Sequence, residues 1–208
     1  MTKIKNQLSY LTIAFLFIPG LLQARKLFSL NKSEEKKPLA MNSIIELGYN
    51  IGIGYMHGSC SDTLINNKEG IGLNYIASFS RKNNFSLGYG IGLNNYKGTN
   101  TLPLIIDMRL STNKKSFNPF LFTNYGITVN WGKNINYTQR WGSEFMIGTG
   151  VKKIVAKNMQ INLCFGYKRQ ITRYNYTNSA SGTNIQAYCY GGHESYNYLV
   201  VKLGVIFS

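Results

Sequence analysis

The feature that most constrains the fold is an alternation of apolar and polar residues with a period of two. It is clearest over residues 85–94, FSLGYGIGLN, where every odd position is apolar and every even position is Ser, Gly or Asn. Successive side chains of a β-strand point to opposite faces, so this pattern predicts a strand with one apolar and one polar face. The pattern recurs along the chain and predicts eight strands, at residues 43–55, 70–80, 85–94, 102–111, 119–130, 141–154, 159–173 and 196–207.

The first 24 residues have the features of a secretory signal peptide. Lys3 and Lys5 precede a short apolar run at residues 11–18, and Ala24 offers a small residue for cleavage. The alternative, a membrane anchor, needs an apolar run of roughly 20 residues. The sequence therefore predicts export, with a signal peptide at 1–24, a polar and flexible segment at 25–42, and a folded domain at 43–208.

The composition is strongly basic, with 23 Lys and Arg against 8 Asp and Glu, a net charge of +15. A basic protein can bind nucleic acid, but export argues against that partner. Basic groups also suit the phosphates of anionic lipids. We therefore expect contact with outer-membrane lipid and lipopolysaccharide, and no nucleic acid.

Eight strands of about ten residues can cross a bilayer at a tilt. Their predicted connections alternate between long and short, as in barrels with longer outer loops and shorter periplasmic turns. We predict an all-β fold: an eight-stranded antiparallel up-and-down transmembrane β-barrel in the outer membrane of a Gram-negative bacterium. Alternation alone would also fit a soluble barrel with its apolar face inside. The signal peptide, the aromatic residues and the glycines favour lipid outside.

Charged residues inside the predicted strands fall on the face opposite the apolar one. On a lipid face, an Arg or Lys near the membrane midplane would cost about 2–4 kcal/mol. In a narrow lumen such charges can pair, and glycines on the same face can make room for them. We predict a lumen charge network of Glu46, Asp107, Arg109, Glu144, Lys152, Lys168 and Lys202.

Aromatic residues with outward phase gather at the ends of the predicted strands. Such residues form girdles at the two membrane boundaries of outer-membrane barrels. We predict one girdle from Trp131 and Trp141 and the opposite one from Phe79, Phe85 and Phe207.

Several short motifs resemble those of a known family. They are LPL at 102–104 leading to Arg109, NPF at 118–120 leading to Tyr125-Gly126, FMIGTGV at 145–151, and a terminal strand ending in Phe207-Ser208. Over residues 43–208 the chain resembles the small outer-membrane β-barrels of Bacteroidetes-type bacteria, known as porin-family or OmpA/OmpX-like barrels. The resemblance implies a barrel and does not indicate an activity.

Two histidines lie near the predicted outer ends of the first and last strands. His57 is close to Ser59, and His193 is followed by Glu194 and Ser195. A His–Ser pair with a carboxylate can carry out acyl transfer. One hypothesis is therefore a lipid A esterase that uses His57/Ser59 or His193/Ser195. The alternative is that two polar loops contain histidine by chance, since no spacing motif is present.

The three cysteines do not form a disulfide framework. Cys60 and Cys189 lie in the same two loops as the histidines, and a disulfide could join them in an oxidising compartment. Cys164 has inward phase in a strand and is interpreted as a packing residue. Cys60, Cys189, His57 and His193 match no zinc spacing, so we expect no metal and no cofactor.

Eight strands leave little space for a water channel once large side chains fill the lumen. We therefore expect a monomeric, non-enzymatic outer-membrane protein with a structural, adhesive or surface-interaction role. Its outer loops, chiefly residues 174–195, would contact extracellular proteins or other surface ligands. The alternatives are the lipid A esterase, a small porin and a soluble ligand-carrying barrel.

Overall fold

The structure is a computed structural model that describes residues 40–58, 64–81, 84–96, 99–112, 117–132, 137–176 and 192–208. The predicted signal peptide, and residues 25–39 of the predicted flexible segment, lie outside this part of the chain. Among the described residues, no helix is long and apolar enough to cross a membrane.

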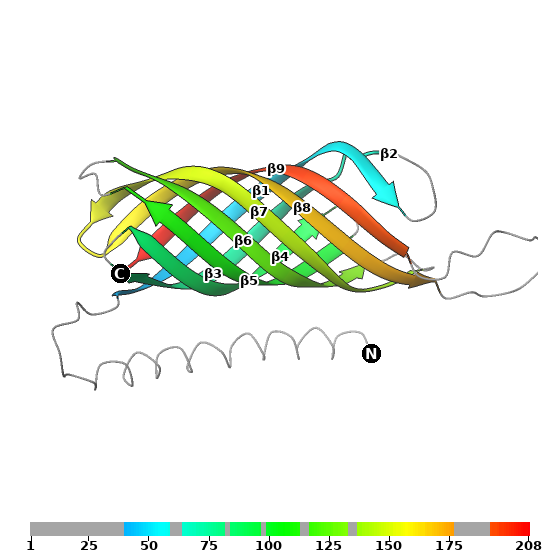
Figure 1. Cartoon of the computed structure of the whole chain (residues 1–208), viewed down its shortest axis with the longest axis horizontal. Helices are drawn as coiled ribbons and strands as arrows, with labels where there is room; N and C mark the ends of the chain where they lie inside the picture. Colours follow the sequence, from blue (N-terminus) through cyan, green and yellow to red (C-terminus); the bar gives the residue numbers. More distant parts are fainter. Residues whose placement is uncertain are drawn as a thin grey trace, which may run out of the picture. The chain divides into compact units, whose positions relative to one another are not determined.

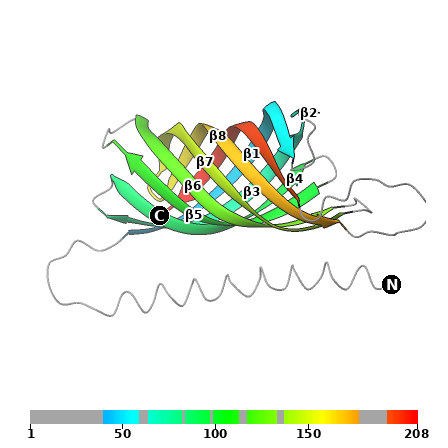
Figure 2. The same cartoon turned by 45° about the vertical axis from the view of Figure 1, so that its right-hand side comes forward.

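Eight long strands and one short strand form a single antiparallel sheet that closes on itself (Figure 1). Successive long strands pair with each other, and β1 pairs with β9 to close the barrel. The strands tilt across the barrel, as the turned view also shows (Figure 2). They are β1 (Ala40–Gly58), β2 (Leu64–Ile65), β3 (Glu69–Arg81), β4 (Phe85–Tyr96), β5 (Thr99–Ser111), β6 (Phe117–Gly132), β7 (Tyr137–Ala156), β8 (Met159–Tyr176) and β9 (Gly192–Phe207).

The predicted fold class is confirmed: the barrel has eight strands around its circumference, and β2 is a short addition beside β1. Several strands are longer than the alternation predicted. β1 begins at Ala40, inside the segment predicted to be flexible, and β7 begins at Tyr137, inside a predicted loop. Main-chain pairing extends these strands beyond the residues whose apolar pattern marks them.

The predicted alternation of long and short connections does not hold throughout. β4 ends at Tyr96 and β5 begins at Thr99, and these two residues pair with each other. The outer connection predicted at residues 97–101 is therefore reduced to 97–98, shorter than the connection between β5 and β6 at the opposite end. Longer connections follow β1 and precede β9.

The apolar side chains of the alternation lie on the outside of the barrel. Leu121 is 60% exposed and Leu47 59%, whereas the inward Glu46 is 0% and Lys202 4% exposed. Water-soluble monomers rarely expose a continuous apolar surface of this extent. An exterior of this kind, around a polar interior, is suited to contact with hydrocarbon chains.

The lumen also contains apolar side chains, which the alternation did not predict. One cluster comprises Tyr96, Phe120, Phe122, Met146, Cys164, Tyr196, Tyr198 and Val200, and a second comprises Ile44, Ile76 and Ile206. The inward glycines accordingly make room for rings as well as for cations. A Cβ at Gly148 would lie 2.7 Å from Phe122 Cζ, whereas one at Gly48 would lie 3.4 Å from Lys202 Cγ.

Candidate functional site

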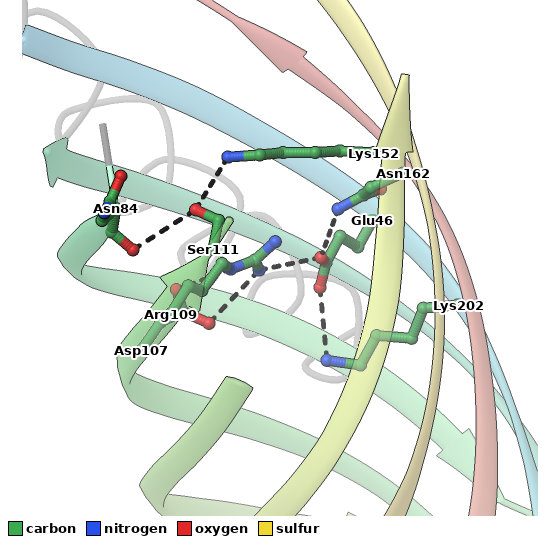
Figure 3. A network of polar contacts seen from close by, with 8 residues as sticks. All are labelled: Glu46, Asn84, Asp107, Arg109, Ser111, Lys152, Asn162 and Lys202. Atoms are coloured by element: carbon green, nitrogen blue, oxygen red, sulfur yellow. Dashed lines mark hydrogen bonds and ion pairs between the residues drawn. The ribbon is translucent and has the colours of Figure 1, made fainter. Parts of the chain in front are cut away.

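Glu46 is the centre of an ion-pair cluster in the half of the lumen nearer the start of β1 and the end of β9 (Figure 3). Its Oε1 accepts from Arg109 Nη2 at 2.8 Å and from Asn162 Nδ2 at 3.0 Å, and its Oε2 accepts from Lys202 Nζ at 3.2 Å. Arg109 Nε also donates to Asp107 Oδ1 at 2.9 Å. Because these side chains are almost fully buried, each charge depends on its partners for stabilisation.

The cluster joins residues far apart in the sequence. Glu46 is on β1, Asp107 and Arg109 are on β5, Asn162 is on β8 and Lys202 is on β9. Close approach is possible because Gly204 is paired with both Glu46 and Asn162. A Cβ at Gly204 would lie 2.8 Å from Glu46 Cγ and closer still to the Asn162 amide, so glycine is required there.

A second cluster lies further along the lumen, toward the outer connections. Lys168 Nζ lies 3.6 Å from Glu144 Oε2 and donates to the Tyr96 hydroxyl at 2.6 Å. The same ammonium lies over the rings of Tyr96 and Tyr198, at 5.3 and 5.7 Å from their centroids. Ion pair and aromatic faces together stabilise this buried cation.

Lys152 does not join either cluster. Its ammonium is half-buried and donates to Ser111 Oγ at 3.0 Å, and Ser111 donates to the Asn84 carbonyl at 3.3 Å. Among the described residues, no carboxylate lies within ion-pair distance of Lys152. Of the seven residues predicted to form one network, six therefore lie in the two clusters and Lys152 lies apart from them.

Between the two clusters lies a cavity of about 20 Å³, whose lining includes Asn50, Asn74, Asn94, Asn124 and Glu144. This volume is enough for about one water molecule. Large side chains of the two clusters, among them Lys168 and Lys202, border this space.

The histidines and serines of the esterase hypothesis lie on β1 and β9 or in the connection after β1. His57 pairs with Ser195 across β1 and β9, the two strands that close the barrel. His193 is exposed and pairs with Arg173 on β8. Ser59 lies outside the described residues.

Glu194 is held at the outer end of the lumen. It accepts a hydrogen bond from the Tyr196 hydroxyl, which also accepts from Lys68 Nζ at 2.9 Å. Alternation along β9 directs Glu194 to the face opposite His193. Burial lowers the pKa of the Lys68 ammonium, and the Glu194 carboxylate offsets part of this effect. The Glu194 carboxylate is thus bound to the Tyr196 hydroxyl of the same strand.

The proposed disulfide cannot be placed, because Cys60 and Cys189 lie outside the described residues. Cys164 is buried and faces the lumen beside Phe120 and Phe122. Within the described ranges, no group of three His, Cys, Asp or Glu side chains could hold a metal ion.

The aromatic residues predicted as girdles lie at opposite ends of the barrel wall. Trp131 and Trp141 are exposed near the outer ends of β6 and β7. Phe85 and Phe207 are exposed near the other end, and Phe79 is half-buried with its ring 6.2 Å from that of Tyr89.

Sequence reasoning missed the inward aromatic residues and the amide of Asn162. A signal for Phe120 and Phe122 was present, because residues 119–122, PFLF, are apolar on both faces of the strand. Such a run indicates a strand that is covered on both sides. Tyr96 and Tyr198 carry no comparable local signal.

Comparison with known protein families finds no match, and comparison with curated proteins finds none. Solved structures do match. Neisserial surface protein A is similar over 82% of this chain and 99% of its own, with a TM-score of 0.56 and 11% identity. The chain has the fold of a small outer-membrane β-barrel. The outer membrane protein OprG from Pseudomonas aeruginosa shares this barrel over 81% of the chain and 96% of its own length, with a TM-score of 0.53 and 10% identity.

Proposed function

We propose that the protein is a monomeric, non-enzymatic barrel that spans the outer membrane of a Gram-negative bacterium, in contact with lipid and lipopolysaccharide. It acts at the cell surface, where its outer connections contact an extracellular protein or another surface ligand. Two properties of the barrel support this proposal: the filled lumen, and the position of the longest outer connections.

The lumen argues against a role as a porin. Two buried ion-pair clusters and a set of aromatic rings occupy it, and the cavity between them holds about one water molecule. Opening a path would require buried charges to lose their partners. We expect no stable conductance in planar lipid bilayers, and regular large openings would contradict this.

The observation that carries the proposal is the position of the two longest outer connections. One follows β1 and the other precedes β9, and β1 and β9 are paired at that end through Gly58 and Glu194. Both connections therefore leave the barrel from neighbouring strands. Beside them, Tyr55 pairs with Ile65 of β2, and these side chains are 54% and 70% exposed. Apolar side chains beyond a membrane-spanning wall are suited to contact with a partner.

The test is adhesion and aggregation of intact cells that display the protein. Residues 177–191 would be replaced by a short Gly-Ser linker, and Ile65→Ser would be made separately. Both changes should reduce attachment to epithelial monolayers or cell–cell aggregation. The control replaces residues 133–136, the outer connection between β6 and β7. If the displayed wild-type barrel causes neither attachment nor aggregation, the proposed role is wrong.

A second candidate is a lipid A esterase, favoured by the pairing of His57 with Ser195. Single substitutions His57→Ala, His193→Ala and Ser195→Ala would be expressed in cells whose lipid A is analysed by mass spectrometry. Under the main proposal, cells with and without the wild-type protein have the same lipid A. A loss of acyl chains that depends on His57 and Ser195 would establish the enzyme instead.

A further inference from the structure

The guanidinium of Arg109 has one nitrogen that the ion-pair cluster does not use. Its Nε and Nη2 donate to Asp107 and Glu46, but Nη1 has no hydrogen-bond partner among the described residues. The Arg109 side chain is only 5% exposed. A buried donor without an acceptor is destabilising, and more so if it is charged. A group that accepts from Nη1 would therefore be favoured.

Lys152 is a second cation in this part of the lumen. Figure 3 shows the unbonded end of the Arg109 guanidinium directed to the side of the cluster on which Lys152 and Ser111 lie. Lys152 is close enough to Arg109 for the two positive charges to interact unfavourably. Because Ser111 Oγ holds Lys152 Nζ at 3.0 Å, the lysine is kept beside the arginine despite this repulsion.

The charge balance of this half of the lumen is also uneven. Two carboxylates, Glu46 and Asp107, face three cations, Arg109, Lys152 and Lys202. Both carboxylates are already bonded within the cluster, so neither compensates Lys152. One additional negative charge beside Arg109 and Lys152 would neutralise the group.

We propose that this end of the lumen is a binding site for a small oxyanion, a carboxylate or a phosphate group. Arg109 Nη1 and Lys152 Nζ are its two charged donors, and Ser111 positions the lysine. Hydrogen bonds between ionised donors and an anionic oxygen are about twice as strong as neutral ones. Lys152 is half-buried whereas Arg109 is buried, so the anion enters from the end of the barrel where β1 begins and β9 ends. The site is independent of the outer connections and of any role they have.

The test uses the folded full-length barrel in detergent micelles. Its thermal unfolding midpoint would be measured against increasing sodium phosphate and, separately, sodium acetate, with sodium chloride at matched ionic strength as reference. An anion that binds the folded state raises the midpoint with a saturable dependence on its concentration. The matched variants are Lys152→Met and Lys153→Met, because Lys153 is the next residue and lies on the outer face over Phe117.

We expect saturation by at least one of the two anions in the wild type and in Lys153→Met. In Lys152→Met the half-saturating concentration should rise about tenfold, which corresponds to the loss of one charged hydrogen bond. The anion that saturates at the lower concentration identifies the class, phosphate or carboxylate. If neither anion acts beyond chloride, or if Lys152→Met saturates like the wild type, the proposed site does not exist. The wild-type titration separates these outcomes even if Lys152→Met does not fold.

Discussion

Replacement of Glu46 by Gln would test whether the buried ion pairs hold the barrel together. Glu46 is 0% exposed and its carboxylate contacts Arg109 at 2.8 Å and Lys202 at 3.2 Å. Glutamine keeps the shape and removes the charge. Arg109 retains Asp107, but Lys202 is left without a carboxylate among the described residues. Removal of one partner from a buried pair costs about 3–5 kcal/mol. We expect Glu46→Gln to lower the free energy of unfolding by about this amount.

The assay is reversible unfolding in denaturant, followed by fluorescence of Trp131 and Trp141 and by mobility on an unheated detergent gel. Glu69→Gln is the control, because Glu69 is exposed and accepts a hydrogen bond from the Tyr49 hydroxyl at 3.0 Å. It should change stability by less than about 1 kcal/mol. In a double variant, Lys202→Met should recover part of the loss caused by Glu46→Gln. If Glu46→Gln costs no more than the control, the ion pairs do not carry the stability assigned to them.

Two further changes probe the wall of the barrel. Leu203 is 56% exposed on the exterior, and Leu203→Arg should lower the free energy of unfolding in lipid by about 2–4 kcal/mol. The control, Thr112→Arg, lies beyond the end of β5 and should change it little. Equal costs would mean that this face does not meet hydrocarbon. Gly148→Ala should destabilise by about 1–3 kcal/mol, because the new Cβ would meet Phe122 Cζ at 2.7 Å and backbone atoms, whereas Gly48→Ala should be tolerated. The unfolding midpoints of the four variants in lipid vesicles would test both predictions.

The local alternation was sufficient to predict the strands and the direction of their side chains. Period two depends on the chain's own geometry, so residues such as Leu87 and Leu163 could be assigned outward before any partner was known. The inward phase of Glu46 and Lys202 followed from the same rule. Strand ends were predicted less well, as at Ala40 and Thr99, because pairing continues where the apolar pattern stops.

The partners of the inward charges were decided by the tertiary structure. Arg109 meets Glu46 across the lumen, between strands that are not neighbours, and this contact depends on how the whole sheet is staggered when it closes. The same closure brings Lys168 to Tyr96, places His57 opposite Ser195, and leaves Lys152 without a carboxylate among the described residues. A sequence read strand by strand specifies which face each charge occupies. The closed barrel determines which charges are near enough to neutralise one another.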